Sequence, residues 1–359
     1  MIPPLIFLLF CKKAFPPLSG GGKVFFSVVY SVSSGTILSY FAGSGLCLLR
    51  LFFGGFRMKK VLVIGSAVAD VIINLEDHLP VTGEDVHVLS QKMQLGGCAY
   101  NVSDMIRHFD VPYIPFFPVG TGAYGDFIRS QFRKRGIETP VPAPGADNGC
   151  CYCFIEAGGE RTFISYHGAE YRFFPEWFDL LDPEEISSVY ICGLEIEEPT
   201  GKNIVSFLEK NPQLTVFFGP GPRIMKISHD LMDRIFALRP ILHLNETEAL
   251  EYSGKACVSE AAAWLYAQTH NTVLITLGRD GCLYYDENAE HLIPGFKAEQ
   301  VDTIGAGDAH IGAVIASLSR GLSLPDAIRT ANRVSAAVVE TQGALLSKEQ
   351  FAGLQIFLQ

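Results

Sequence analysis

The chain places glycines and acidic residues directly before an expected helix, in VDTIGAGDAHIGAVIASL, residues 301–318. Apolar residues then recur at i, i+3, i+4 and i+7, which predicts an amphipathic helix with a buried stripe of Ile311, Val314, Ile315 and Leu318. The backbone N–H groups of Gly305, Ala306 and Gly307 are almost unscreened by side chains, and a helix N-terminus of this kind binds anions. Asp308 puts a carboxylate beside that anion. Two negative groups held together require a proton to pass between them or a cation to separate them, so the stretch predicts a catalytic site.

Two further polar groups follow the first apolar segments of the chain. Asp70 stands in IGSAVADVI, just after an expected strand, where a solvated or capping residue is the alternative explanation. LGGCAYN pairs Gly96 and Gly97, whose bare backbone a ligand can approach, with Asn101, whose amide both donates and accepts hydrogen bonds. A plain turn before a helix would explain LGGCAYN equally well, so both interpretations stay open.

Two polar groups in the second half of the chain also follow expected strands. In LNETEA, Glu248 lies three residues after Asn245, on the same face of a helical turn. This pair suits a hydrated Mg²⁺, and helix capping is the competing explanation. Thr276 and Gly278 stand at another strand end, where a hydroxyl and bare backbone can contact a phosphate. Strand ends are where α/β sheets bind ligands, although the sequence contains no GxxxxGK[ST] loop.

The elements that must hold these residues alternate along the chain after Met58. Short apolar runs predict strands at Val61–Ile64, Val189–Ile191, Val216–Phe218, Ile241–Leu244 and Val273–Leu277. Helical periodicity lies between them, at Tyr124–Arg135, His229–Leu238 and Ser259–Thr269. This alternation predicts an α/β fold in which helices cover both faces of a parallel sheet.

Two segments break this alternation. Residues 71–95 are typical of paired strands around PVTGED, and residues 149–166 of a hairpin that turns at Gly158 and Gly159. Strands without covering helices predict a small sheet that stands off the main body as a lid. The hairpin's cysteines have no second pair at zinc spacing, so we expect small core residues in a strand at Cys150, Cys151 and Cys153.

Charge separates the first 57 residues from the rest. The whole chain has 28 basic and 38 acidic residues, a net charge of −10, which argues against a nucleic-acid partner. Residues 1–57 hold no Asp or Glu, and 26 uncharged residues between Lys23 and Arg50 make a weak membrane span interrupted by Ser and Gly. Because MKKVLVIG at Met58 is typical of a natural start, we interpret residues 1–57 as a non-native upstream extension. A membrane anchor or a targeting peptide is the alternative.

Taken together, these motifs resemble a known family. DTIGAGDAHIG, residues 302–312, is similar to the C-terminal signature DTxGAGDxFxG of the ribokinase-like (PfkB) carbohydrate kinases, and GGCAYNVS resembles their N-terminal signature. The other polar groups follow in the family's order, and the resemblance covers about residues 58–346. The combination of GGCAYN, DNGCC, GERTF and GAGDAH is most similar to a poorly characterised sugar-kinase branch.

The resemblance implies transfer of the γ-phosphoryl group of ATP to a sugar hydroxyl. It makes Asp308 the general base and Gly305, Ala306 and Gly307 the anion hole. The residues it implies for substrate hydroxyls are Asp70, Gly96, Gly97 and Asn101. Those implied for the nucleotide are Thr276, Gly278, Asn332 and Gly343. Mg²⁺, through water, is implied at Asn245 and Glu248, and a monovalent cation, often K⁺ in relatives, at Asp302.

The sequence departs from the family pattern at three places. His310 replaces a usual Phe beside the base, where it either packs or touches substrate. Gly219 in FGPGPR replaces a usual Asp, which puts an auxiliary contact in doubt but not the core chemistry. Phe109 and Asp110 replace the "LG" that often ends the helix after the first signature.

Alternatives remain within this framework. A nucleoside kinase is the alternative to a sugar kinase, and a catalytically silent sugar sensor is the alternative to an enzyme. A sugar-phosphate substrate would require basic residues at the acceptor, for which the candidates are Arg107, Arg161 and Arg172. Nine cysteines at this length favour a reducing, cytoplasmic location over a disulfide scaffold, and the lid is a candidate surface for a homodimer.

Overall fold

The computed structural model describes residues 26–31, 37–43, 46–52, 58–287 and 289–356. The chain forms two compact units, Met1–Met58 and Lys59–Gln359. In the first, an antiparallel sheet is formed by β1 (Phe26–Ser31), β2 (Ile37–Gly43) and β3 (Leu46–Phe52). Part of the uncharged stretch after Lys23 lies outside the described residues, and the interpretation of residues 1–57 stays a prediction. No helix among the described residues combines the length and apolarity needed to cross a membrane.

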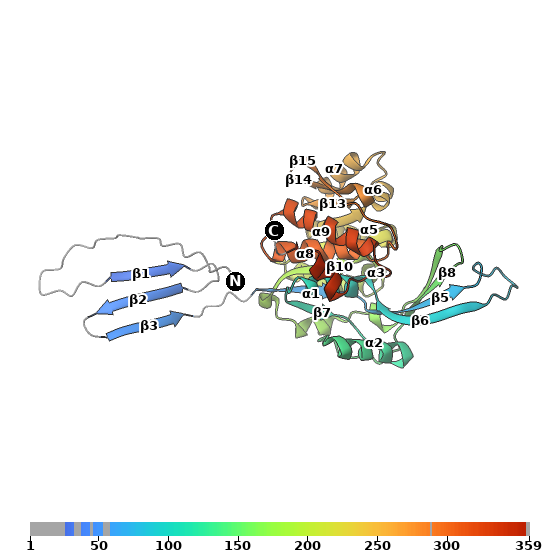
Figure 1. Cartoon of the computed structure of the whole chain (residues 1–359), viewed down its shortest axis with the longest axis horizontal. Helices are drawn as coiled ribbons and strands as arrows, with labels where there is room; N and C mark the ends of the chain where they lie inside the picture. The colour runs from blue at the N-terminus through green and yellow to red at the C-terminus, as the bar shows by residue number, and fades with distance from the viewer. Residues whose placement is uncertain (1–25, 32–36, 44–45, 53–57, 288, 357–359) are drawn as a thin grey trace, which may run out of the picture. The chain divides into compact units, whose positions relative to one another are not determined.

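The second unit is built on an eight-stranded sheet in the order β15-β14-β13-β12-β11-β10-β4-β7. Strands β15, β14, β13, β10 and β7 of this sheet are labelled in Figure 1. From β7 to β13 all neighbouring strands are parallel. The bounds are β4 (Lys60–Ile64), β7 (Tyr113–Phe116), β10 (Ile186–Cys192), β11 (Thr215–Gly219), β12 (Ile241–Asn245), β13 (Val273–Thr276), β14 (Gly281–Asp286) and β15 (Ala289–Pro294). The predicted α/β sheet and its five named strands are confirmed. The antiparallel edge of β14 and β15 was not predicted; only a short turn joins β13 to β14, too short for a parallel crossover.

Helices cover both faces of this sheet. They are α1 (Cys98–His108), α2 (Gly122–Arg135), α3 (Gly193–Glu197), α4 (Gly201–Lys210), α5 (His229–Ala237), α6 (Glu246–Ser253), α7 (Val258–Thr269), α8 (Ala306–Ser319), α9 (Leu324–Val339) and α10 (Lys348–Gly353). Side chains of β4 alternate between the two cores, with Val61 and Val63 in one and Leu62 and Ile64 in the other. This alternation follows from the two-residue period of a strand buried on both faces.

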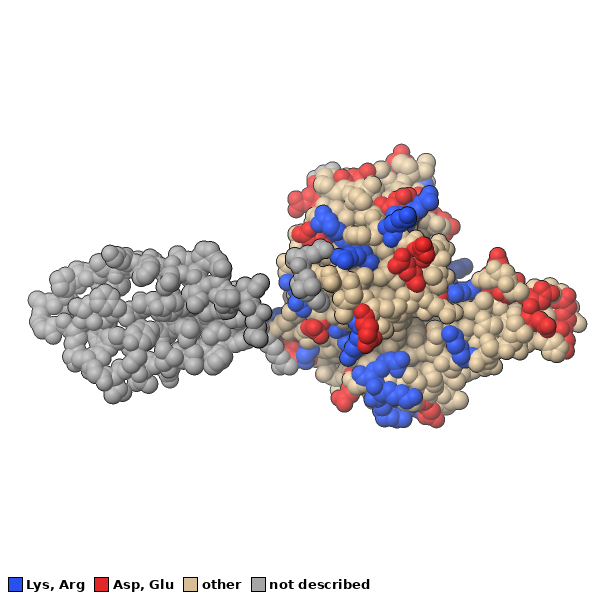
Figure 2. Space-filling view, in the orientation of Figure 1, with Lys and Arg blue, Asp and Glu red and all other residues tan. Residues whose placement is uncertain are grey.

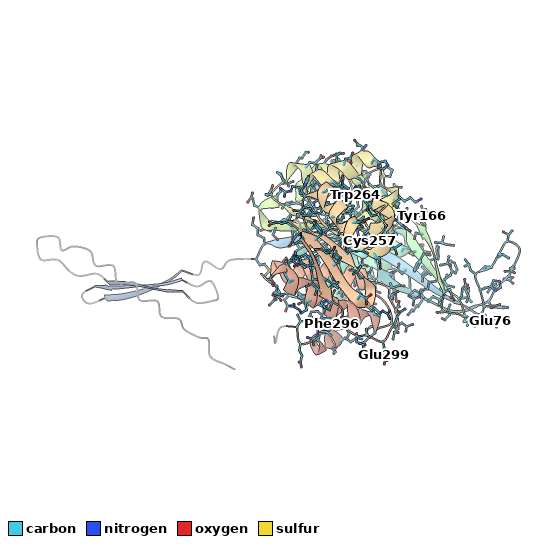
Figure 3. The ribbon with its side chains drawn as sticks, turned by 90° about the horizontal axis from the view of Figure 1, so that it is seen from above. Glu76, Tyr166, Cys257, Trp264, Phe296 and Glu299 are labelled. Carbon is cyan, nitrogen blue, oxygen red and sulfur yellow. The ribbon has the colours of Figure 1, made fainter. Side chains whose placement is uncertain are left out.

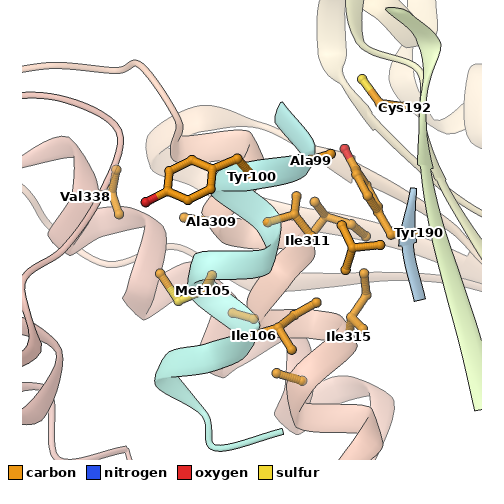
Figure 4. Packing of buried hydrophobic residues seen from close by; sticks show 14 of the residues in the cluster. Ala99, Tyr100, Met105, Ile106, Tyr190, Cys192, Ala309, Ile311, Ile315 and Val338 are labelled. Atoms are coloured by element: carbon orange, nitrogen blue, oxygen red, sulfur yellow. The ribbon is translucent and has the colours of Figure 1, made fainter. Parts of the chain in front are cut away.

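The close packing of α1 against α8 sets the geometry of the site (Figure 4). Ile311 and Ile315 of α8 lie in the same buried cluster as Ile106 of α1 and Tyr190 of β10. A Cβ at Gly312 would stand 3.0 Å from the Val102 carbonyl oxygen, so glycine lets the two helix backbones approach. The N-terminal turns of both helices are thereby brought together.

The separate small sheet predicted from the sequence is present, and we refer to it as the lid sheet. Its order is β6-β5-β8-β9, from β5 (Val68–Leu75), β6 (Val88–Gly96), β8 (Cys150–Ile155) and β9 (Arg161–Tyr166). It extends away from the helices of the body, and acidic residues gather at its free end, where Glu76 lies (Figures 2 and 3). Cys150 and Cys153 are buried in β8, as expected of small core residues, and Cys151 is half-buried.

Candidate active site

The Asp308 carboxylate lies where the first turns of α1 and α8 meet. Asn101 Nδ2 of α1 donates a hydrogen bond of 2.9 Å to Asp308 Oδ2. Burial raises the pKa of Asp308 to about 6, although hydrogen bonds from Asn101 and Cys98 oppose the shift. The carboxylate is therefore ionised at neutral pH but is a far better proton acceptor than an ordinary aspartate. That combination suits a general base.

The loop before α8 is shaped by a glycine requirement. Gly305 is the N-cap of α8 and has φ +76°, a left-handed conformation that favours glycine. A Cβ there would lie 2.4 Å from the Ala344 Cβ, so the loop at residues 340–344 packs directly on the glycine loop. Gly307 has open space around the position of a Cβ. The Ala306 N–H donates to the Thr303 carbonyl oxygen at 3.3 Å, so among the described residues the turn offers an incoming anion the N–H groups of Gly305 and Gly307 first.

Two cavities meet at this turn. The first has a volume of about 300 Å³, and its lining includes Asp308, Asn245 and Glu248. The second, of about 390 Å³, is lined by Gly278, Ala306 and Asn332 among others. Thr276 and Gly307 line both cavities. A group that passes from a molecule in one cavity to a molecule in the other would therefore cross in front of Gly307, beside the Asp308 carboxylate.

Asp70 lies inside β5 of the lid sheet, not in a turn after a strand. Burial raises its pKa to about 7, and among the described residues it has no hydrogen-bond donor. A Cβ at Gly96 would stand 1.8 Å from Asp70 Oδ2, so only glycine leaves room for this carboxylate. Gly97, with φ +100°, is the N-cap of α1 and starts the helix that carries Asn101. Asp70 does not line the first cavity.

Asn245 and Glu248 form a capping box at the start of α6. The Glu248 N–H donates to Asn245 Oδ1 at 2.8 Å, and the Glu248 carboxylate accepts from the Asn245 backbone N–H and from Nδ2. Both residues also line the first cavity. Each Glu248 oxygen keeps one acceptor site, since each takes a single hydrogen bond. Capping therefore leaves this pair able to hold the waters of a hydrated Mg²⁺.

The expected nucleotide residues divide into two groups. Thr276, Gly278 and Asn332 line the second cavity, whereas Gly343 lines neither cavity. Both amide hydrogens of Asn332 are taken by the carbonyl oxygens of Ile293 and Pro294. Asn332 Oδ1 accepts a hydrogen bond from His310. The Asn332 amide can therefore contact a ligand by packing, but its hydrogens are already donated to the protein.

His310 is buried in a hydrogen-bonded chain. Its Nε2 lies 3.0 Å from Asn332 Oδ1, and its Nδ1 lies 2.9 Å from His243 Nε2. Because Asn332 Oδ1 can only accept, His310 carries its hydrogen on Nε2 and accepts from His243. Burial lowers the pKa of His310 to about 4 and that of His243 far below its usual range. His310 is thus a neutral packing residue that links the linings of the two cavities.

The Asp302 carboxylate forms an ion pair with an arginine. The Arg161 guanidinium of β9 binds both of its carboxylate oxygens, at 2.6 and 3.1 Å. Of the other arginines considered for a sugar phosphate, Arg107 is paired with Asp104 and Arg172 is exposed, and neither they nor Arg161 line the first cavity.

Sequence reasoning missed three contributors to the first cavity. His243 lies two residues before Asn245 on β12, and the two-residue period of a strand would have placed both on one face. Arg223 belongs to the FGPGPR stretch; its guanidinium is held by Glu197, with contacts of 2.5 to 2.9 Å. Tyr190 fills the space next to Gly219, where a Cβ would lie 3.4 Å from the ring.

A helix-covered parallel sheet, a lid sheet and paired cavities around an aspartate at a helix N-terminus define a small-molecule kinase of the ribokinase type. The model of the pfkB family carbohydrate kinases matches residues 58–350, and the chain belongs to this family. It is an ATP-dependent carbohydrate kinase.

Named relatives agree with this assignment. The chain is 34% identical over 289 residues to the uncharacterized sugar kinase YegV of Escherichia coli K12, covering 79% of this chain and 90% of that protein. It is 28% identical over 301 residues to the ribokinase of Staphylococcus aureus strain COL, covering 80% and 96%. A solved ribokinase from Thermotoga maritima shares the fold, with a TM-score of 0.71, 21% identity, and coverage of 83% of this chain and 99% of that one.

Proposed function

We propose that this enzyme transfers the γ-phosphoryl group of ATP to a hydroxyl group of a sugar, with Asp308 as the general base. The observation that carries the proposal is the place of the Asp308 carboxylate, hydrogen-bonded to Asn101 at the turn that both cavities share. The reacting hydroxyl of the sugar enters the first cavity at Asp308, with the rest of the sugar toward Asn101 and Asp70 outside that cavity, and the nucleotide occupies the second cavity. Similarity to a sugar kinase and to a ribokinase supports the acceptor class.

In this scheme the residues mainly position and neutralise charge. The acceptor hydroxyl gives its proton to the Asp308 carboxylate as its oxygen bonds to the γ-phosphorus, and the bond from the γ-phosphorus to the bridging oxygen breaks to leave ADP. The backbone N–H groups of Gly305, Ala306 and Gly307 bind the oxygens of the transferring group. Asp70 and Asn101 orient the sugar hydroxyls, because a carboxylate accepts such hydrogen bonds strongly.

Mg²⁺ would be held through water by Asn245 and Glu248, where it supplies neutralisation of the phosphate charge. Both side chains line the first cavity next to Thr276, which reaches the second. The capping hydrogen bonds fix their orientation without using all of their acceptor sites.

A nucleoside acceptor is the second candidate, favoured by the likeness in fold to a nucleoside kinase from Methanocaldococcus jannaschii, with a TM-score of 0.68. A sugar phosphate is disfavoured because the arginine that lines the first cavity, Arg223, is already neutralised by Glu197.

The test is a screen of ADP formation with free sugars, nucleosides and sugar phosphates, followed by ligand titration of Asp70→Ala. We expect turnover with a free sugar, and a loss of sugar affinity in Asp70→Ala that far exceeds any loss of ATP affinity. Asp77→Ala, at an exposed residue of the turn between β5 and β6, is the matched control. Turnover confined to nucleosides would replace the sugar by a nucleoside, and unchanged sugar affinity in Asp70→Ala would remove that residue from the substrate site.

A further inference from the structure

The lid sheet is tied to the body by an ion pair that lies beside the glycine loop. Arg161, the first residue of β9, binds the Asp302 carboxylate through both terminal nitrogens: Nη1 to Oδ1 at 2.6 Å and Nη2 to Oδ2 at 3.1 Å. The Asp302 side chain is 3% exposed and that of Arg161 is 25% exposed. A bidentate pair of this kind is both directional and shielded from water.

Asp302 also receives two backbone hydrogen bonds. Oδ1 accepts from the N–H of Ile304 at 3.0 Å, and Oδ2 from the N–H of Gly343 at 2.9 Å. Burial alone would raise the pKa of Asp302, but Arg161 and these N–H groups outweigh it and hold the pKa below its usual range. Each carboxylate oxygen thus accepts two hydrogen bonds, which fills its acceptor capacity.

This arrangement does not fit a monovalent cation at Asp302. A cation such as K⁺ would have to displace the guanidinium or share a carboxylate that has no acceptor site left. The fixed positive charge of Arg161 would also repel it, since a guanidinium stays protonated at any physiological pH. The sequence-based expectation of a cation site at this residue is therefore not supported by the geometry.

The contacts of Asp302 continue into the anion hole. Gly343 belongs to the loop whose Ala344 packs against Gly305, and Ile304 precedes Gly305 in the chain. The guanidinium thus joins three segments: β9 of the lid sheet, the glycine loop and the loop at residues 340–344. A movement of β9 that withdrew Arg161 would leave the buried Asp302 charge without its partner, at a large energetic cost.

We propose that Arg161 is a positioning residue that acts as a built-in cation. It holds the glycine loop in its anion-binding shape only while the lid sheet is seated, and it makes phosphoryl transfer independent of any monovalent cation. This inference rests on the proposed function, because it assigns the anion hole to the Gly305–Gly307 turn. It predicts that lid position and anion-hole geometry change together.

The first test is kinetic and uses the full chain with a sugar that it phosphorylates. At equal ionic strength, the parent kcat is expected to be the same in potassium, sodium, caesium and choline chlorides. Arg161→Ala is expected to lower kcat by about 10- to 100-fold, as misplacement of reacting groups does. Millimolar guanidinium or K⁺ is expected to restore part of that loss, whereas urea and choline do not. Arg172→Ala, at an exposed arginine, is the matched control and should behave as the parent does.

The second test requires no catalysis. Hydrogen exchange of backbone amides in residues 161–166 and 302–307 is expected to accelerate together in Arg161→Ala and to remain unchanged in Arg172→Ala. If Arg161→Ala does not fold, Arg161→Lys provides the test, because it keeps the positive charge but cannot bind both carboxylate oxygens at once. Its exchange rates are expected to lie between those of the parent and of a chain without the ion pair.

Three results would overturn the inference: activation of the parent by K⁺ over choline, a parent-like kcat in Arg161→Ala, or a loss that neither guanidinium nor K⁺ restores. Failure of the proposed function would be seen separately. In that case Asp308→Asn would keep its turnover, while the exchange experiment would still report on the link between β9 and the glycine loop.

Discussion

Burial of the Asp308 carboxylate raises its pKa, and a raised pKa is what a general base requires. Its pKa of about 6 leaves it ionised at neutral pH, so kcat/KM of the parent is expected to fall as the pH drops below about 6.

Asp308→Asn keeps the side-chain shape but removes the base, and kcat should fall about 10²- to 10⁴-fold with little change in ATP affinity. Steady-state kinetics and a nucleotide titration measure both quantities. A variant with most of its turnover would contradict the assignment.

The same residue should limit the stability of the fold. The pKa of Asp308 is raised from 3.8 to about 6, so between these values the native state keeps a proton that the unfolded chain has lost. Stability therefore falls as the pH rises through this window, and the penalty is complete above it. Asp308→Asn is expected to raise the free energy of unfolding at pH 7.5 by about 1–3 kcal/mol, with a smaller gain at pH 4.5. Urea denaturation at both pH values tests this, and an equal gain at both would rule out titration as the cause.

For single residues, the sequence predicted which residues belong to the site better than it predicted which residues they contact. Asp308 and Asn101 were identified because each stands beside glycines at a helix start, and the structure joins them by a hydrogen bond. The pairing of Arg161 with Asp302 could not be predicted, since 141 residues separate them and only the placement of the lid sheet brings them together. Asn332 was expected near the nucleotide, but its amide bonds to β15 and His310, contacts that no local pattern encodes.

At the scale of elements, Asn245 and Glu248 cap the start of α6 and are also the proposed holders of hydrated Mg²⁺. Glu248→Gln keeps a side chain that can cap the helix but removes the charge that orders the waters of Mg²⁺. The Mg²⁺ concentration for half-maximal activity is therefore expected to rise severalfold, with little loss of thermal stability. The exposed neighbour Glu246, in the same first turn, provides the control variant Glu246→Gln. Unchanged Mg²⁺ dependence in Glu248→Gln would leave that residue a capping role alone.

Helices and strands were predictable where burial imposes a regular spacing on the apolar residues of the sequence. The strands β4, β10, β11, β12 and β13 of the main sheet are buried on both faces, so they appear in the sequence as short apolar runs. Helix α8 was placed by its apolar stripe and the glycines before it. The edge strand β15 was missed because it is mostly exposed and lacks such a run. Its neighbour β14 was missed although Gly281–Asp286 is a short, mostly buried run. Helix packing through Gly312, which sets the distance between α1 and α8, depends on tertiary contact and leaves no periodic signal.

At the scale of the whole molecule, the lid sheet exposes apolar side chains that a monomer would be expected to cover. Leu89 of β6 and Ile164 and Tyr166 of β9 are more than half exposed. We expect these residues to pair two copies of the chain, so that Ile164→Glu combined with Tyr166→Glu shifts the protein to the monomer in sedimentation velocity. Leu180→Glu, at an equally exposed residue of the body, is the control. A parent that sediments as a monomer would contradict the pairing.

The chain divides into its two compact units at Met58. The unit Lys59–Gln359 contains both hydrophobic cores, both cavities and the lid sheet, and the family match begins at residue 58. Its first strand, β4, starts at Lys60 and is buried between β7 and β10. A chain that starts at Met58 is therefore expected to fold cooperatively and to match the kcat of the full chain. Thermal unfolding and kinetics of the two chains side by side decide the matter. A lower melting temperature or lost turnover in the shorter chain would show that residues 1–57 contribute to the functional enzyme.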